Sequence, residues 1–473
     1  MTREDIIELS NNYKTQAERD ILKRFFSISP QPTHSDLAKL NYSKNTIVFS
    51  CPGESGTSYF RILEPLLAIY RETDEFNLVY TESIAPIHFN IANLIIVHRA
   101  GPFHDMAHSV INHWPSHRVK PYIIHNVDDN ETNLPRTHPM HLMWQVQKRD
   151  QQALRSLRDS NGVEITTRKM KQVMLNHNKN VWITRNYFNW NLPQWKLEKK
   201  KPLSDFRTNL TEEQKKHFEF PEEWNDKIVI GWAGLTSHFE DLKKMQPILK
   251  AIHDKHPNTV FVLAGMALQD SMYDIDIDPK TREPIIKEKP MEEKLRYKKR
   301  VTDVFEGFDM SRMKIYDALL LEDYGWFYSL FDIGIAYIEH NSFNAAKSEI
   351  KVVEYMKYGA LPVFSNFGGY ADLLDIMVAN NIIESNEVSL FGCRTEFNKT
   401  EWINKISHII DNIDTEQMNS YRTRFKSFVE DYYNIDNNII NVITEYKRLM
   451  EDYGEKQNTQ ILQLKSLGTT MVV

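Results

Sequence analysis

The sequence lacks the features that mark membrane-spanning, disulfide-bonded and metal-binding proteins. Its 473 residues include only two cysteines, Cys51 and Cys393, which give neither a disulfide framework nor a metal-ligand spacing. No apolar run approaches the roughly 18 residues of a membrane span, and the best run, residues 91–97, has the length of a strand. The polar, acidic start, MTREDIIELSNNYK, is unlike a signal or transit peptide. We therefore expect a reducing, cytoplasmic setting and no transmembrane segment.

Glycine is scarce, at 16 residues, and no sign of charge dominates the whole chain, whose formal net charge is −6. The charge is unevenly distributed, however. Residues 1–200 carry 25 basic and 20 acidic side chains, whereas residues 201–473 carry 33 basic and 44 acidic ones. Because 473 residues exceed what one core accommodates, we predict two domains. The charge difference suggests that these domains bind different ligands.

Short apolar runs alternate with helical patterns along the chain, which predicts an α/β fold with parallel sheets covered on both faces. We expect strands at residues 46–50, 76–80, 94–97, 122–125, 227–232, 259–265, 314–320, 332–339 and 361–366, and helix from 401 to 452. We predict a helical extension over 1–44, a first Rossmann-like domain over 45–210, a second over 211–430, and a helix and tail over 431–473. Because ligands bind such folds at the carboxyl ends of strands, the loops there should carry the chemistry.

Two loops of the first half follow predicted strands and carry polar residues. In CPGESGTSYFR, Ser55 and Gly56 offer backbone N–H groups to an anion or a sugar, and Arg61 follows them. In IIHNVDDN, a histidine and two carboxylates leave a strand together and can act as a base, orient a hydroxyl or bind a metal; the residues are His125, Asp128, Asp129 and Asn130. A plain strand-to-helix turn and simple helix capping remain alternative interpretations of these loops.

Two segments of the second half invite comparison. In GWAGLTSHFEDL, Gly234 and Ser237 precede a helix whose N-terminus favours phosphate, and His238 adds a donor; capping alone is the alternative. In MYDIDIDPKT, aspartates alternate in a way that binds a metal and a nucleotide in another class of transferase. That segment belongs to a charged insertion, residues 267–299, which we interpret as a long, solvated loop with some helix.

The segment FNAAKSEIKVVEYMKYGALPVFSN places charged residues directly before a buried strand. At 3.6 residues per turn, Lys347, Lys351 and Glu354 are expected to share one helix face. Taken alone, this pattern is equally typical of a surface salt-bridge stripe.

These segments, taken in order, resemble glycosyltransferases of the GT-B fold, of the family 4 type, most sharply over residues 226–375. Family members carry two glutamates eight residues apart, the second of which binds the ribose hydroxyls of the nucleotide. Glu354 matches the second, whereas Ala346 stands where the first would be. A branch that includes proteins of large tailed phages instead shows an Asn and Lys pair before a Lys and Glu, which Asn344 and Lys347 match, followed by Lys351 and Glu354.

The resemblance implies two Rossmann-like doubly wound domains that face each other across a cleft. It also implies transfer of a sugar from a nucleotide donor, with UDP as the favoured nucleotide, to an acceptor hydroxyl. Retention of configuration and independence of metal or other cofactors are expected, although Ala346 leaves retention and inversion open. The candidate catalytic residues are His125, Asp128, His238 and Lys347; the candidate donor-binding residues are Gly56, Gly234, Ser237, Asn344, Lys351 and Glu354; the candidate acceptor-binding residues are Ser55, Arg61, Asp129 and Asn130.

The acceptor is open at this stage. The basic first half suits an anionic acceptor, and the phage-like branch suggests a hydroxymethylated DNA base, in which case the host cytoplasm would be the site of action. A glycan or lipid-linked saccharide is the alternative acceptor. A non-catalytic protein that binds a nucleotide sugar, or a phosphorylase-like or epimerase activity on the same fold, are the alternative functions.

Overall fold

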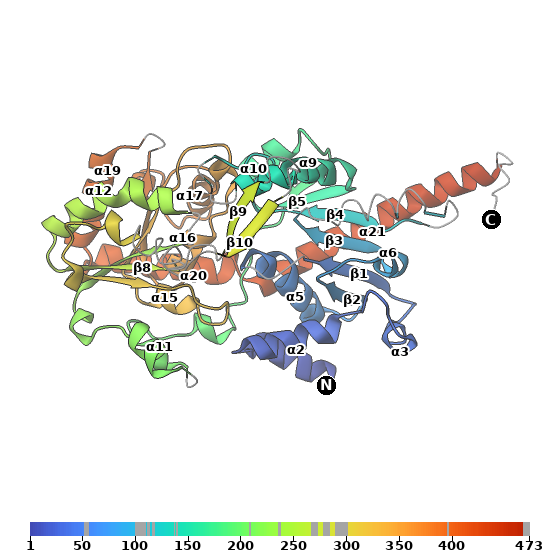
Figure 1. Ribbon diagram of the computed structural model, residues 1–473, viewed down its shortest axis with the longest axis horizontal. Coiled ribbons are helices and arrows are strands. Elements are labelled where there is room, and N and C mark those ends of the chain that lie inside the picture. The colour runs from blue at the N-terminus through green and yellow to red at the C-terminus, as the bar shows by residue number, and fades with distance from the viewer. Residues whose placement is uncertain are drawn as a thin grey trace. The chain divides into compact units, whose positions relative to one another are not determined.

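The computed structural model describes residues 1–51, 56–99, 110, 114–115, 119–136, 138, 141–207, 210–234, 238–265, 273–277, 284–288, 301–394 and 397–466. The chain divides into two compact units. Unit 1 comprises Met1–Thr132, Lys148–Asn189 and Tyr432–Val473, and unit 2 comprises Asn133–Gln147 and Trp190–Asp431. Each unit contains one six-stranded parallel sheet with flanking helices (Figure 1). The predicted fold class, α/β with two Rossmann-like domains, is therefore confirmed.

The sheet of unit 1 has the strand order β2-β1-β3-β4-β5-β6. Its strands are β1 (Asn45–Ser50), β2 (Phe76–Thr81), β3 (Leu94–His98), β4 (Tyr122–Asn126), β5 (Gly162–Ile165) and β6 (Val181–Ile183). β3 and β4 are buried along their whole length, as continuous apolar runs in a parallel sheet should be. The chain runs outward from β1 in both directions, so the strand order reverses between β1 and β3.

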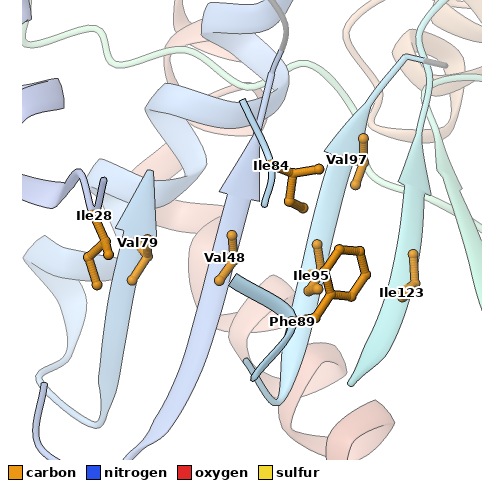
Figure 2. Close-up of a cluster of buried hydrophobic side chains, with 8 residues drawn as sticks. All are labelled: Ile28, Val48, Val79, Ile84, Phe89, Ile95, Val97 and Ile123. Carbon is orange, nitrogen blue, oxygen red and sulfur yellow. The ribbon is translucent and has the colours of Figure 1, made fainter. Parts of the chain in front are cut away.

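A cluster of buried hydrophobic side chains, drawn in Figure 2, packs on one face of this sheet. The members of the cluster are Ile28, Val48, Val79, Ile84, Phe89, Ile95, Val97 and Ile123. Alternate residues of four neighbouring strands supply most of it because side chains two apart point to the same face of a strand. The ring of Phe89, on α6 (Pro86–Ile91), lies against this face.

The helices of unit 1 cover both faces of its sheet. They are α1 (Arg3–Asn12), α2 (Gln16–Phe26), α3 (His34–Leu37), α4 (Gly56–Ser58), the π-helix η1 (Tyr59–Leu63), α5 (Glu64–Glu72), α6, α9 (Arg149–Asp159), α10 (Arg168–Met174) and α21 (Ile435–Ser466). Threonines 2, 15 and 33 each begin a helix with a capping box. α21 packs against α5 and β4, and the Tyr446 hydroxyl lies 3.3 Å from both carboxylate oxygens of Glu164.

The sheet of unit 2 has the order β11-β8-β7-β12-β13-β14. Its strands are β7 (Ile228–Ala233), β8 (Thr259–Ala264), β11 (Met313–Tyr316), β12 (Ile333–Ala336), β13 (Leu361–Ser365) and β14 (Gly392–Cys393). Numbered within the unit, this is the order 3-2-1-4-5-6 of dinucleotide-binding folds, whose ligands bind where the order reverses, beyond the carboxyl ends of the strands. In unit 2 that point lies between β7 and β12.

The helices of unit 2 precede, connect and follow these strands. They are α8 (His141–Val146), η2 (Pro193–Trp195), η3 (Leu203–Asp205), α11 (Glu212–His217), η4 (Glu222–Trp224), α12 (Phe239–Lys255), η6 (Met310–Arg312), α15 (Gly325–Ser329), η7 (Asn344–Ala346), α16 (Ile350–Lys357), α17 (Gly369–Ala379), α18 (Val388–Phe391), α19 (Lys399–Asp411) and α20 (Glu416–Tyr432). No helix in the described part of the chain combines the length and the apolar character that a membrane span requires.

Several sequence-based expectations about local structure were wrong. The insertion after β8 holds an antiparallel hairpin, β9 (Tyr273–Ile277) and β10 (Pro284–Glu288), so Asp274 and Asp276 lie in a strand rather than in a loop. β5 was missed because Glu164 interrupts its apolar run; its carboxylate is buried and accepts a hydrogen bond from Asn126 at 2.6 Å. The end of the chain is helical as predicted, with α19, α20 and a separate last helix, but that helix, α21, continues beyond residue 452 into the predicted tail as far as Ser466.

Candidate functional site

The carboxyl ends of β7 and β12 in unit 2 bring together several of the predicted residues. Gly234 follows β7, His238 precedes α12, and Lys351 and Glu354 lie on α16, which follows β12. α12 begins here, at an N-cap where the His238 side chain makes no capping hydrogen bond, and the positive end of a helix dipole favours an anion. The site therefore stands at the reversal of strand order, where this fold binds its ligands.

Gly234 allows the side chains of His238 and Lys351 to approach the backbone. A Cβ atom placed on this glycine would lie 3.2 Å from Cδ2 of His238 and 3.3 Å from Nζ of Lys351. Such contacts are tighter than ordinary van der Waals packing, so any other residue here would displace the imidazole or the ammonium. The absence of a Cβ atom at position 234 thus keeps both donors close to the end of β7.

His238 is oriented by the carboxylate of Asp241, in the first turn of α12. Nδ1 of His238 lies 2.8 Å from Oδ2 of Asp241, and the backbone N–H of Glu339 donates to Oδ1 at 2.9 Å. Burial raises the pKa of Asp241 to about 6, against the lowering effects of the Glu339 N–H, Lys351 and Lys347. Asp241 is thus ionised at neutral pH, which assigns Nδ1 of the imidazole as the donor in this pair.

Lys351 is a buried cation. Its side chain is 8% exposed, and Nζ makes no hydrogen bond to any residue that the structure describes. The ammonium lies 5.4 Å from the ring centroid of Trp232, whose buried Nε1 is likewise without a hydrogen-bond partner among the described residues. Burial lowers the pKa of Lys351 to about 8, with Asp241 opposing that change. An unsatisfied buried ammonium is costly, and an anionic ligand would satisfy it.

Glu354 lies one turn further along α16 and is 4% exposed. The Tyr324 hydroxyl donates to its Oε1 at 2.8 Å. Burial raises the pKa of Glu354 to about 7, against the lowering effects of hydrogen bonds from Tyr328 and Tyr324 and of the charge on Lys351. A buried carboxylate near its pKa can accept hydrogen bonds from the hydroxyls of a ligand.

The segment before α16 differs from its prediction. Lys347 follows the short helix η7 in an extended conformation, with φ −64° and ψ 146°, and α16 begins only at Ile350. Lys347 therefore does not share a helix face with Lys351 and Glu354; its Nζ lies 5.0 Å from the Phe343 ring centroid. Its charge still influences the pKa of both Asp241 and Lys351.

Asn344 and Ala346 occupy the loop between β12 and α16. The Asn344 side-chain amide donates to the Glu339 carbonyl at 2.9 Å, and its backbone N–H donates to Asn341 Oδ1 at 2.8 Å. Asn344 thus braces this loop. Ala346 is fully buried, so no carboxylate stands where the resemblance places the first family glutamate.

In unit 1 the predicted carboxylates gather around an arginine that the sequence analysis missed. Arg99, at the end of β3, has a left-handed backbone with φ 63°. Its guanidinium lies 3.2 Å from Asp128, 3.4 Å from Asp129 and 3.6 Å from Glu131. A non-glycine residue held in this conformation is strained and is found chiefly where surrounding contacts enforce it.

The other predicted residues of unit 1 are dispersed around its strand ends. Arg61 is 3% exposed, and its guanidinium donates to Asn126 Oδ1 at 2.8 Å and to the Thr184 carbonyl, so it points into the unit. His125 ends β4 with 2% exposure. Asn130 is buried and accepts a hydrogen bond from Thr132 at 2.7 Å.

Gly56 begins α4 with open space around it. Ser55 and Ser237 lie outside the described residues.

Two of the residues that sequence reasoning missed, Tyr324 and Arg99, act through contacts distant in the chain. Tyr324 lies thirty residues before Glu354, and only the i, i+4 spacing of Tyr324 and Tyr328 hinted that they share a side. Asp241 had a stronger signal, since it follows His238 at i+3 in a helix turn. Arg99 carried no signal beyond its place after a strand.

No protein-family model matches the sequence, and no curated protein matches it either. Solved structures do resemble the chain. A glycosyltransferase from Rickettsia africae matches with a TM-score of 0.51 and 12% identity over 86% of this chain and 99% of that one. The Anabaena protein HepE, solved with UDP and glucose, matches with a TM-score of 0.48 and 14% identity over 85% of this chain and 99% of that one.

A UDP-GlcNAc 2-epimerase from Neisseria meningitidis, bound to UDP-GlcNAc, matches with a TM-score of 0.43 and 11% identity over 85% of this chain and 99% of that one. At these identities a likeness assigns a fold and no activity. The Rickettsia match therefore shows that the chain has the fold of a glycosyltransferase.

Proposed function

We propose that the protein is a glycosyltransferase that moves a sugar from a nucleotide-sugar donor to an acceptor hydroxyl. One observation carries this proposal: a buried ammonium without a hydrogen-bond partner among the described residues, Lys351, stands one helical turn from a buried carboxylate, Glu354. A nucleoside diphosphate presents the complementary groups, because its phosphates need cations and its ribose hydroxyls need acceptors. The position of both residues at the reversal of strand order supports the same ligand class.

The proposed division of labour follows from charge. Lys351 and His238 bind the diphosphate beside Gly234, Lys347 adds a further positive charge, and Glu354 accepts hydrogen bonds from the ribose. In the reaction the bond between the sugar carbon and the diphosphate oxygen breaks, and the acceptor oxygen bonds to that carbon. The acceptor proton passes to the leaving phosphate. Negative charge grows on the diphosphate as its bond to the sugar breaks. Positively charged groups fixed beside it therefore lower the barrier, and each such group typically raises the rate by about 10²–10³-fold.

We propose UDP as the nucleotide of the donor. We also propose that the sugar is transferred with retention of configuration and without a metal ion. The ammonium of Lys351, the imidazole of His238 and the amino end of α12 supply positive potential at one place, which supports a metal-independent departure of the diphosphate.

The acceptor is proposed to be anionic, with a hydroxymethylated DNA base as the specific candidate and a glycan or lipid-linked saccharide as the alternative. The distribution of charge in unit 1 supports an anionic acceptor. Residues 148–179, which include α9 and α10, carry eight basic and three acidic side chains, and the acidic Glu164 is buried. Strands β4, β5 and β6 are sequential neighbours in the sheet, so right-handed connections place α9 and α10 on one face of it.

The experiment that tests this function incubates the purified protein with UDP-, GDP- and ADP-sugars, each with water, glycans, lipid-linked saccharides or hydroxymethylated DNA. Mass spectrometry then follows both the free nucleotide and the mass of the acceptor. We expect release of one nucleotide together with a sugar-sized gain on one acceptor. Absence of binding to every nucleotide and nucleotide sugar would overturn the proposal.

A second function, binding of a nucleotide sugar without turnover, is favoured by one observation. Ala346, fully buried, replaces the first glutamate of the family that the sequence resembles. Thermal stabilisation by a nucleotide sugar, with no turnover on any acceptor of the panel, would favour this second function over the first.

A further inference from the structure

Two tyrosines lie beside the Glu354 carboxylate, and the nearer one donates a hydrogen bond to it. Tyr324 immediately precedes α15, and its hydroxyl lies 2.8 Å from Oε1 of Glu354. Tyr328, one turn later on α15, lies near Glu354, and its hydroxyl lowers the pKa of that carboxyl. Residues four apart on a helix lie on one side of it, so both phenols face the region of the same carboxylate.

These phenols are themselves held by a rigid aromatic group. The Trp195 ring meets Tyr324 edge-on at 5.4 Å between centroids and stacks with Tyr328 at 6.4 Å. The backbone N–H of Gly325 donates to Gln194 Oε1 at 3.2 Å. A Cβ on Gly325 would lie 2.5 Å from the Gln194 carbonyl oxygen, so only glycine permits this close approach between α15 and η2.

The hydrogen bond from Tyr324 and the nearby Tyr328 hydroxyl have a chemical consequence for Glu354. Donors to an ionised carboxylate stabilise its charged form and so oppose the effect of burial. A carboxylate has about four acceptor positions, and the phenols occupy only some of them. They thereby fix the rotation of the group and leave acceptor positions for another pair of hydroxyls. A protonated, freely rotating carboxyl would lose an acceptor and this orientation.

We propose that Tyr324 and Tyr328 are positioning residues that hold the Glu354 carboxylate as a two-hydroxyl acceptor, and that they thereby make the protein prefer ribonucleotides to 2′-deoxyribonucleotides. This inference rests on the proposed function, in which Glu354 binds the ribose of the donor. A 2′-deoxyribose lacks one of the two hydroxyls. One acceptor position of the buried carboxylate would then stay unpaired, which is unfavourable.

The test measures binding by titration calorimetry between pH 5.5 and 9. UDP, GDP and ADP are each titrated into the intact wild-type protein, and the nucleotide that binds most tightly is compared with its 2′-deoxy form. The same pair is then titrated into Tyr324→Phe and Tyr328→Phe. The matched control is Tyr358→Phe, because Tyr358 belongs to the same aromatic group but donates to the Gln194 backbone carbonyl instead of to Glu354.

We expect wild type to prefer the ribonucleotide by about 10-fold or more, the usual value of a hydrogen bond to a charged group. Each Tyr→Phe variant should reduce this preference severalfold and move the loss of binding at acid pH to a higher pH. Tyr358→Phe should change neither quantity. Because a merely structural role would weaken both nucleotides equally, an unchanged ratio with an unchanged pH profile in both variants would overturn the inference.

A second comparison keeps the inference falsifiable if a single variant folds poorly. In a Glu354→Gln background, the added Tyr328→Phe change should have no further effect on the ribonucleotide preference, and an independent loss of preference would contradict the proposed coupling. Failure of wild type to bind any of the three nucleotides overturns the proposed function itself. Binding with a ribose preference that the tyrosines do not influence overturns only the positioning role.

Discussion

The two units share a sheet architecture, but the strand ends of unit 2 leave a buried charge less compensated than the ion pairs of unit 1 do. In unit 1, Arg71 lies 2.7 Å from the fully buried Glu64 and 3.0 Å from Asp436, and Arg99 meets three carboxylates. In unit 2, Lys351 has no hydrogen-bond partner among the described residues. Glu354 is met there by phenols and by no cation within ion-pair distance in the described part of the chain.

This difference separates structural charges from those that await a ligand. A buried ion is destabilising unless a partner and hydrogen bonds compensate it. The pairs of unit 1 supply that compensation within the protein. At the strand ends of unit 2 this compensation is incomplete. The folded protein therefore retains the free-energy cost of a buried charge, which binding of a complementary ligand removes. The same substitution, a charge replaced by an isosteric neutral group, should therefore have opposite effects on stability in the two units.

Arg71→Met should give the largest effect. It leaves the Glu64 carboxylate buried beside the Tyr59 hydroxyl without its cation, and removal of one member of a buried pair typically costs about 3–5 kcal/mol. Urea unfolding followed by circular dichroism measures the loss. A variant as stable as wild type would show that this pair contributes no net compensation.

Lys351→Met should have the opposite sign for stability and a large effect on function. The neutral side chain removes an uncompensated charge, so we expect the free energy of unfolding to rise. Turnover should fall by about 10²–10³-fold, the typical loss when one group that stabilises developing negative charge is removed. Urea unfolding and the nucleotide-release assay check the two effects. A destabilised Lys351→Met protein would mean that the ammonium has a structural partner.

Glu354→Gln should reveal the cost of burying the carboxylate through its pH dependence. Because the pKa of Glu354 rises from 4.5 to about 7 on folding, its contribution to stability is complete below pH 4.5 and is lost as pH rises through 7. Glutamine does not titrate. The variant should thus match wild type near pH 4.5 and become more stable as pH rises to 7, by up to about 1.4 kcal/mol per pH unit.

Thermal unfolding at pH 4.5, 6 and 8 measures this trend. Tyr358→Phe serves as a control that should show no such trend, because its hydroxyl does not contact Glu354. A stability difference between Glu354→Gln and wild type that is constant with pH would contradict a raised pKa.

The sequence predicted the fold well because continuous apolar runs have few alternatives in a chain of this length. Val48, Ile95 and Ile123 lie in strands whose burial their neighbours already indicated. Prediction from the sequence failed where contacts between side chains distant in the chain decide the local structure. β5 was hidden by Glu164, whose charge is acceptable in a buried strand because Asn126 and Tyr446 hydrogen-bond to it and the Arg61 guanidinium lies 3.9 Å away.

The candidate site shows the same division. The spacing of Lys351 and Glu354 correctly indicated a common helix, since both lie on α16. The extended conformation of Lys347 was not predictable, because the preceding η7 turn ends there and local spacing does not encode that end. The contact from Tyr324 to Glu354 depends on how α15 packs, and helix periodicity contains no information about it.

Asp241→Asn should give the smallest effect, and one that separates positioning from electrostatics. Asparagine keeps a similar shape but removes a negative charge near Lys351, so the diphosphate of UDP should bind as well as before or a fewfold more tightly. His238, however, loses its charged partner at 2.8 Å, and we expect turnover to fall by about 10-fold, the value of one charge-assisted hydrogen bond. Calorimetry with UDP and the nucleotide-release assay measure these effects separately. A general loss of structure would lower both UDP affinity and turnover. Unchanged or tighter UDP binding together with slower turnover would therefore support two roles for Asp241: its carboxylate orients His238, and it competes with the diphosphate for the positive charge of Lys351.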